Sequence, residues 1–409
     1  MSESLHLFEG YGIEMEYMIV DRQSLQVKPI CDQVLEALGG SIVNEVSLGT
    51  VNVSNELVLH VIEFKCNGPQ KDWPGMAKAF HEQVTRVNRL LERWEATLLP
   101  TAMHPLMNPQ NETRLWPHGQ NSIYATYNRI FDCRGHGWSN LQSVHINLPF
   151  SGDDEFGRLH AAIRLVLPLL PGLAASSPIV EGRVTGKEDN RLDFYSQNQK
   201  KIASIIGHVI PERVFTERDY QEKIFAPIKR DITPHDPEGV LEEEWLNSRG
   251  AIARFERQAI EIRVLDIQES VRADFAVVSL VVSLVQSLVN ETWLSYEEQR
   301  QADELELKSC FLGALDLGGQ FMVRQPFLLQ AFGLKEPVSL QTLWQQVARA
   351  LDGEHYPLVH FRDEVQQLLS KGTLSSRIRR QLGSSPQRGA VESVYHELAR
   401  CLADGRFYV

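Results

Sequence analysis

The chain has 409 residues, of which 43% are hydrophobic and 23% charged, a globular composition that excludes a disordered or fibrous protein. Its length allows two to three domains or one large body. Lys plus Arg number 41 and Asp plus Glu number 53, so the formal net charge is −12. Nucleic acids and anionic membranes attract positive charge, so neither is expected as a partner. An acidic total can instead contain a focused group of carboxylates that binds metal.

The five cysteines are widely spaced and form no C-x-x-C pair. A disulfide framework and a zinc ribbon are therefore not expected, and a reducing compartment fits better. The N-terminal residues lack a basic segment followed by an apolar one, which a signal peptide requires. We expect a cytoplasmic protein.

Two strands and one helix are expected in the first hundred residues. Residues 12–20 alternate between polar and apolar positions, and residues 57–66 form a second β-like run that ends in the turn signal Asn67-Gly-Pro69. Apolar residues recur at three- and four-residue steps over 76–98, which predicts an amphipathic helix.

The middle of the chain predicts two more strands, over 144–148 and 259–265, and two helices, over 155–173 and 273–293. The first of these helices is expected to break at a proline near its end. Residues 182–258 are polar, contain prolines and show weak periodicity, so we expect substrate-binding loops there. Because strands and helices do not alternate regularly, a doubly wound parallel sheet is disfavoured. We predict an α+β fold with an antiparallel sheet.

The pattern is helical from about residue 297, and the last helix is expected to begin near Pro386 and to end at Gly405. We therefore predict a catalytic domain over 1–295 and a helical C-terminal region over 296–409 that packs on the same body. The uncharged run 275–290 is too short to span a membrane, so a buried helix is expected. Its apolar content also raises the hypothesis of a homodimer.

Several acidic side chains lie inside otherwise apolar strands. Glu14 and Glu16 share one face of their strand, because successive strand side chains point to opposite faces. Glu63 lies between apolar neighbours, and Glu56 precedes it by seven residues. Two further strands carry polar pairs on one face, and these are His145 with Asn147 and Glu261 with Arg263.

An amphipathic sheet with one wet face would explain any one of these residues. Four such segments together are harder to explain, because an unpaired buried charge costs several kcal/mol. Metal ions remove that cost, and oxygen ligands with one imidazole suit hard cations such as Mg²⁺ or Mn²⁺. The sequence therefore favours a metal site, on the assumption that the four strands are neighbours.

At these residues the chain resembles the glutamate–cysteine ligase family, including its carboxylate–amine ligase branch, within the glutamine synthetase superfamily. The segment from Gly12 to Glu16 resembles the family's G-x-E-x-E strand, and Glu56 and Glu63 match its two acids seven residues apart. Further matches are His104-Pro105, the strand around His145, the arginine loop with Arg249 and Arg254, and the E-x-R-x-x-D strand from Glu261 to Asp266. The branch usually has His-x-His, and Ser143 replaces the first histidine here.

The resemblance implies a curved, glutamine-synthetase-like antiparallel sheet that is lined with metal ligands and covered by helices. It also implies ATP-dependent amide formation, with glutamate's γ-carboxylate activated as an acyl phosphate and an amine such as cysteine attacking it. ATP and two to three Mg²⁺ ions, or Mn²⁺, would be the cofactors. The implied metal ligands are Glu14, Glu16, Glu56, Glu63, His145 and Glu261.

The resemblance further implies that Arg263 holds the transferring phosphoryl group, because its planar fork pairs with phosphate oxygens. Arg249 is expected to bind a substrate carboxylate or a nucleotide phosphate, with Arg254 as a weaker candidate. Asn147 could donate to phosphate or substrate. By strand alternation Asp266 faces away from Glu261, so a structural role is open for it, as it is for His104.

Two other functions remain open. A non-catalytic protein of the same fold could bind a nucleotide or an amino acid, and a metal-dependent hydrolase could use the same acidic sheet to cleave amides. A complete acidic set together with Arg263 favours catalysis over binding alone. The partners expected in either enzyme are small molecules.

Overall fold

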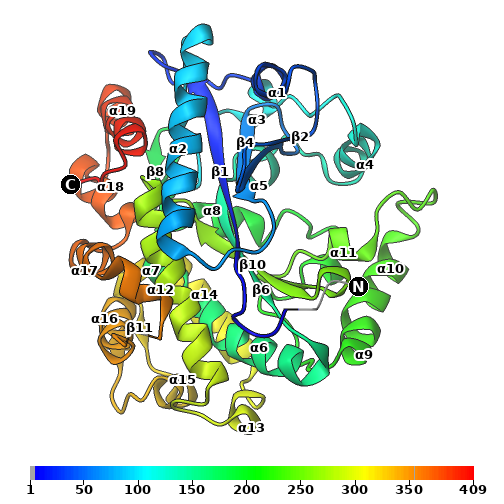
Figure 1. The fold of residues 1–409 in the computed structure, drawn as a ribbon, viewed down its shortest axis with the longest axis vertical. Coiled ribbons are helices and arrows are strands. Elements are labelled where there is room, and N and C mark those ends of the chain that lie inside the picture. Colours follow the sequence, from blue (N-terminus) through cyan, green and yellow to red (C-terminus); the bar gives the residue numbers. More distant parts are fainter. Residues whose placement is uncertain (1–4, 354) are drawn as a thin grey trace.

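The computed structural model describes residues 5–353 and 355–409. Its centre is an eight-stranded antiparallel sheet in the order β2-β3-β4-β1-β6-β10-β9, and β5 pairs with β1 at the other end of that strand. Figure 1 shows β1 running through the middle of the molecule. The strands are β1 Gly12–Asp21, β2 Glu45–Ser47, β3 Val51–Asn55, β4 Val61–Cys66, β5 Ala96–Leu99, β6 Ser143–Pro149, β9 Ala251–Arg254 and β10 Ala259–Asp266. The predicted α+β fold with an antiparallel sheet is confirmed.

The helices before residue 295 are α1 Cys31–Gly39, α2 Trp73–Leu91, α3 Pro109–Glu112, α4 Asn121–Phe131, α5 His136–Ser139, α6 Gly152–Val166, α7 Pro171–Ala174, α8 Asn190–Tyr195, α9 Glu217–Tyr220, α10 Ala226–Ile232, α11 Glu243–Leu246 and α12 Val271–Val289. A short hairpin, β7 Ile179–Val180 with β8 Arg183–Val184, lies between α7 and α8. The region 182–258, where substrate-binding loops were expected, contains β8, several short helices and β9.

One face of the sheet is apolar and packs against long helices. Ile13, Met15 and Tyr17 of β1 are fully buried in the main core, as is Phe64 of β4. Helices α2 and α6 each pack against α12, and both also contact the sheet (Figure 1). Because side chains alternate along a strand, this packing directs the acidic positions to the opposite face.

Helix α12 is a core helix. Among the described residues it alone is long and apolar enough to cross a membrane by composition, with a mean hydropathy of 1.6, but 89% of that stretch is buried inside the protein. Ser270 caps its first turn by accepting from the Ala273 amide. The predicted buried helix is confirmed. Its apolar surface is used within the chain and lends no support to a homodimer.

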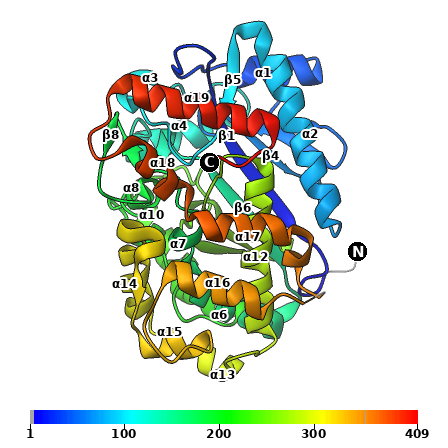
Figure 2. The same cartoon turned by 90° about the vertical axis from the view of Figure 1, so that its left-hand side faces the viewer.

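The C-terminal region is mostly helical (Figure 2). Its helices are α13 Tyr296–Gln299, α14 Glu304–Leu317, α15 Pro326–Ala331, α16 Leu340–Ala350, α17 Arg362–Lys371, α18 Leu374–Leu382 and α19 Arg388–Asp404, and two short strands, β11 Met322–Val323 and β12 Val338–Ser339, pair between them. Gly405 ends α19 in a left-handed conformation, as expected. Residues of this region belong to the main core. The boundary at residue 295 stays a prediction.

Two predicted elements differ from the structure. The helix expected over 76–98 ends at Leu91, because Glu95 adopts a positive φ of 52° and residues 96–99 pair with β1 instead. The strand expected over 57–66 begins only at Val61. Glu56 therefore lies in the connection after β3, and not in a strand.

Candidate active site

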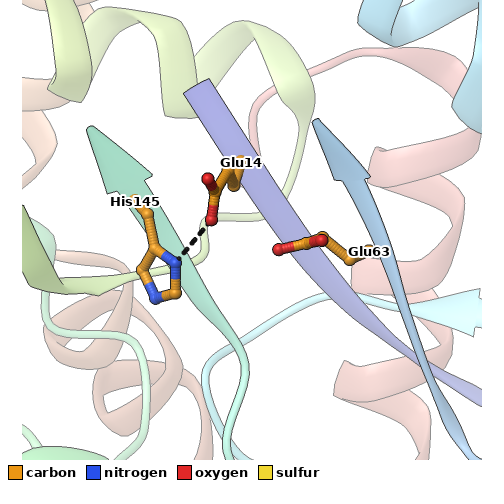
Figure 3. Close-up of side chains that lie close together, drawn as sticks. All are labelled: Glu14, Glu63 and His145. Carbon is orange, nitrogen blue, oxygen red and sulfur yellow. Dashed lines mark hydrogen bonds and ion pairs between the residues drawn. The ribbon is translucent and has the colours of Figure 1, made fainter. Parts of the chain in front are cut away.

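The strand register places the predicted acidic residues on one face of the sheet. Glu16 of β1 pairs with Glu63 of β4, and Glu14 pairs with His145 of β6 on the other side. Glu261 of β10 pairs with Asn147 of β6. Figure 3 shows Glu14, Glu63 and His145 extending from three strands toward a common space. The assumption that these strands are neighbours is correct.

Glycine at position 12 allows one of these close approaches. A Cβ atom on Gly12 would lie 3.0 Å from Cβ of Asn147, which is tighter than most real contacts. Asn147 uses the space to donate from Nδ2 to Oε1 of Glu14 at 3.0 Å. The lack of a side chain at Gly12 thus leaves room for Asn147 on the neighbouring strand.

Five of the six predicted metal ligands form two overlapping groups. One group contains Glu14, Glu63 and His145, and the other contains Glu16, Glu56 and Glu63. In each group the ligand atoms lie within 4.8 Å of one another. Carboxylate oxygens with one imidazole suit Mg²⁺ or Mn²⁺, and Glu63 could serve both groups.

The electrostatics of the cluster also fit a cation. Burial, and next the charge of Glu14, raises the pKa of the Glu63 carboxyl to about 7, although Lys65 opposes this. Burial and the charges of Glu63 and Glu16 raise the pKa of Glu56 well above its usual range. Carboxylates that repel one another in this way are stabilised by a divalent ion.

Glu14 and His145 form the best-paired contact in the cluster. The His145 Nδ1 atom lies 3.0 Å from Oε2 of Glu14 (Figure 3). Burial alone would raise the pKa of Glu14, but the hydrogen bond and charge of His145 lower it to about 2. Burial would likewise lower the pKa of His145, and the surrounding carboxylates raise it instead.

Three residues that support the cluster were not predicted. The Ser143 hydroxyl lies 2.8 Å from Oε2 of Glu16 and 3.0 Å from Nε2 of His145. Ser54 donates to Oε2 of Glu63 at 2.7 Å, and Lys65 pairs with the same oxygen at 3.1 Å. Alternation could have identified Lys65, since it shares a face with Glu63. Ser54 required the β3–β4 register.

Arginines lie at the β10 side of the cluster. The Nε atom of Arg263 lies 2.9 Å from Oε1 of Glu261, and its side chain remains 24% exposed. Arg254 donates from Nε to Oε2 of Glu261 at 3.3 Å. The Glu261 Oε1 atom is 3.9 Å from Nδ1 of His145, so Glu261 connects the arginines to the acidic groups but belongs to neither group.

Arg249 lies apart from this arrangement. It is buried and pairs with Glu212, and its Nη1 donates to Oδ1 of Asn247 at 3.0 Å and to the Ser204 carbonyl at 3.2 Å. The expected order of the two arginines is therefore reversed, because Arg254 meets Glu261 and Arg249 does not. A substrate role for Arg249 stays a prediction that these contacts do not support.

Asp266 lies on the site face, contrary to the prediction. Between Ile262 and Leu265 strand β10 advances three residues while β6 advances two. The extra residue reverses the alternation, so Asp266 pairs with Ser143, which contacts the cluster. Asp266 is nevertheless buried against Ser176, Ser177 and Arg191.

His104 has a structural role in the described contacts. Its Nε2 atom lies 2.7 Å from the Leu25 carbonyl, and its Nδ1 accepts from the Leu106 amide at 3.1 Å. This arrangement requires the neutral imidazole with the proton on Nε2. Burial lowers the pKa of His104 to about 4, although the Leu25 carbonyl opposes the shift.

We expect His104 to make the protein less stable in mild acid. Because its pKa is lowered on folding, its contribution is complete above pH 6.5 and is lost as pH falls toward about 4. The loss is about 3 kcal/mol at most. Urea unfolding at pH 7.5 and 5 should show a smaller pH effect in His104→Gln than in the parent, whereas exposed His360→Gln should match the parent. Equal pH effects in all three proteins would contradict this role.

Comparison with solved structures gives the class of fold. The chain superposes on glutamate–cysteine ligase from Francisella tularensis in complex with AMP with a TM-score of 0.61 and 12% identity, over 97% of this chain and 89% of that one. It also superposes on a bifunctional glutathione synthetase from Pasteurella multocida with a TM-score of 0.57 and 12% identity, over 97% of this chain and 52% of that one. The fold is thus that of the glutamate–cysteine ligases.

The sequence comparison identifies the family. The model for glutamate–cysteine ligase family 2 matches residues 11–317, and the chain belongs to this family. An uncharacterised protein of Archaeoglobus fulgidus is 36% identical over 68% of this chain and 75% of its own length. A Bradyrhizobium protein, provisionally named glutamate–cysteine ligase 2, is 24% identical over 68% of this chain and 62% of its own length. The match thus spans less than two thirds of that relative.

Proposed function

We propose that the protein is an ATP-dependent carboxylate–amine ligase of the glutamate–cysteine ligase type. Its acid substrate is the γ-carboxylate of glutamate, and its amine substrate is cysteine or a similar amine. Family membership supports the class of carboxylate–amine ligases. The structural similarity to the Francisella tularensis ligase in complex with AMP supports a nucleotide site. We further propose that the enzyme is cytoplasmic. We also propose that its sheet is of the glutamine-synthetase type.

The observation that carries this proposal is the meeting of five carboxylates, one imidazole and two arginines at one face of the sheet. A triphosphate beside a substrate carboxylate concentrates negative charge, so a ligase of this kind needs cations at the point of transfer. The raised pKa values of Glu56 and Glu63 fit a site that is built for such cations.

The donor set fits two to three Mg²⁺ or Mn²⁺ ions. The residues that would hold them are Glu14, Glu16, Glu56, Glu63, His145 and Glu261. When bound, these ions neutralise phosphate charge and bring ATP and the carboxylate together. Ser54 and Ser143 orient their ligands by hydrogen bonds, as outer partners of metal ligands generally do.

The reaction proceeds by two substitutions. A carboxylate oxygen of the acid attacks the γ-phosphorus of ATP, the bond to the β-phosphate oxygen breaks, and ADP leaves. The amine nitrogen then attacks the acyl carbon, phosphate leaves with the former carboxylate oxygen, and the amine releases a proton to solvent. Arg263 holds the transferring phosphoryl group, Arg254 supports it through Glu261, and Asn147 donates to a substrate oxygen once it leaves Glu14.

One contact raises the hydrolase alternative again. The hydroxyl of Ser143 meets Nε2 of His145, whose Nδ1 meets Glu14, which is the connectivity of a hydrolytic triad. Ser143 also contacts Glu16 and is buried, and the carboxylates around it would destabilise an oxyanion. Geometry therefore favours a supporting role for Ser143.

A purified-protein assay tests the proposal. With Mg²⁺, ATP and glutamate, we expect phosphate release that depends on an added amine, together with a new amide detected by mass spectrometry. Omission of glutamate is the control. ATP binding without amine-dependent turnover would favour the non-catalytic binder, and amide cleavage without ATP would favour the hydrolase.

A further inference from the structure

Arg263 occupies the irregular part of β10, where one extra residue interrupts the pairing with β6. Irregular strand positions lack the ladder hydrogen bonds that normally fix the backbone, so other groups must fix them. The Arg263 amide donates to the Gly250 carbonyl at 2.9 Å. The Arg263 carbonyl is held by a side chain from a distant part of the sequence.

That side chain is Arg191 of α8. Its Nη2 donates to the Arg263 carbonyl at 2.9 Å, and its Nη1 donates to Oδ1 of Asp266 at 3.2 Å. The other oxygen of Asp266 accepts from the Ser176 amide at 2.8 Å and from the Ser177 hydroxyl at 3.1 Å. Arg191 therefore joins the backbone of the irregular segment, at Arg263, to Asp266, which is itself held by the loop that contains Ser176 and Ser177.

We propose that Arg191 is a positioning residue for Arg263, and this inference rests on the proposed ligase function. Arg191 does not contact the acidic cluster, and it acts by fixing the backbone from which the Arg263 side chain extends toward Glu261. A clamp on a transferring phosphoryl group must hold its geometry closely, since misplacement by about 1 Å can lower a rate roughly 100-fold.

A purely structural role must be distinguished from this one, because a buried ion pair also affects stability. The chain offers a matched control in Arg377 and Glu269. Both pairs have an arginine side chain that is 3% exposed and an acid that is 0% exposed, and in both the arginine also donates to a main-chain carbonyl. The control pair joins Glu269 to Arg377 of α18, and the described contacts do not connect this pair to Arg263.

The experiment compares Arg191→Lys with Arg377→Lys. Both should lower the melting temperature, but only Arg191→Lys should lower kcat, by about 10- to 100-fold, with KM for ATP changed less than about twofold. In an Arg263→Lys background, Arg191→Lys should cause no further loss. If Arg191→Lys does not fold, the neutral pair Arg191→Gln with Asp266→Asn removes the buried charges together.

A crystal structure of the Arg191 variant supplies a readout that does not depend on activity. We expect Nε of Arg263 to leave its contact with Glu261. An unmoved Arg263, an equal kcat loss in Arg377→Lys, or an additive loss in the Arg263→Lys background would each overturn the inference. Absence of turnover in the parent would instead refute the proposed function, and the position of Arg263 would still decide the role of Arg191.

Discussion

The Glu63→Gln variant should lose at least about 100-fold in turnover, and its metal-free form should be more stable than the parent. Glu63 belongs to both groups of candidate ligands, so its loss weakens both metal positions at once. The amide keeps the shape of the side chain but cannot carry the charge that a cation requires. Removing a carboxylate from a crowded acidic site also removes repulsion.

The pH dependence of stability sharpens this prediction. The pKa of Glu63 is raised on folding from 4.5 to about 7, so its cost to the metal-free protein is absent below pH 4.5 and grows as pH rises through 7. The cost reaches about 3 kcal/mol above that pH. Glu63→Gln should remove it, because the amide does not ionise.

Three measurements check the variant. Thermal unfolding in EDTA at pH 8 should give a higher melting temperature for Glu63→Gln than for the parent. Added Mg²⁺ should raise the melting temperature of the parent much more than that of the variant. Steady-state turnover gives the third value. Exposed Glu92→Gln is the matched control and should behave as the parent in all three. Parent-like Mg²⁺ stabilisation of Glu63→Gln would remove Glu63 from the metal set.

The Arg263→Lys variant should lose about 100- to 1,000-fold in kcat, which is the range observed when one group that stabilises a transition state is removed. Lysine keeps the positive charge but not the planar fork that pairs with two phosphate oxygens. Its pairing with Glu261 should survive in part, so the fold should remain intact.

The control and the readout separate binding from transfer. Exposed Arg257→Lys lies only six residues away and should keep parent turnover. Calorimetry with a non-hydrolysable ATP analogue and Mg²⁺ should give similar affinity for Arg263→Lys and the parent, because the clamp acts during transfer. A loss of affinity as large as the loss of kcat would mean that Arg263 mainly binds the nucleotide.

Strand alternation correctly predicted which residues share a face of their strand, because alternation depends only on the local chain. It placed Glu14 with Glu16 and His145 with Asn147, and the register then brought both pairs to one face. The family resemblance supplied the expectation that these strands belong to one sheet lined with metal ligands, which no local pattern contains. The buried helix α12 was equally clear from its composition.

The failures share a physical cause, which is that pairing across the sheet overrides local preference. Leu98 continues a helical pattern but lies in a strand, where it pairs with Ile19 of β1. Ser54 acquires a role only because β3 lies beside β4. Arg249 and Arg254 look equivalent in sequence. Only Arg254 is at the end of a strand next to Glu261, so only it reaches the cluster.

The extra residue in β10 changes the phase of the strand, which means that it reverses the face on which each following side chain lies. A regular strand of this length would send Asp266 into the apolar helix layer, where a lone carboxylate would be costly. With the phase changed, one strand presents Glu261 and Arg263 to the proposed reaction and Asp266 to Arg191 on the same face. Deleting one residue between Ile262 and Leu265 would leave a regular sheet with Asp266 still opposite Ser143, but it would remove the irregular stretch whose Arg263 carbonyl accepts from Arg191. The extra residue thus decides how the backbone of the strand is held as well as which side chains it presents.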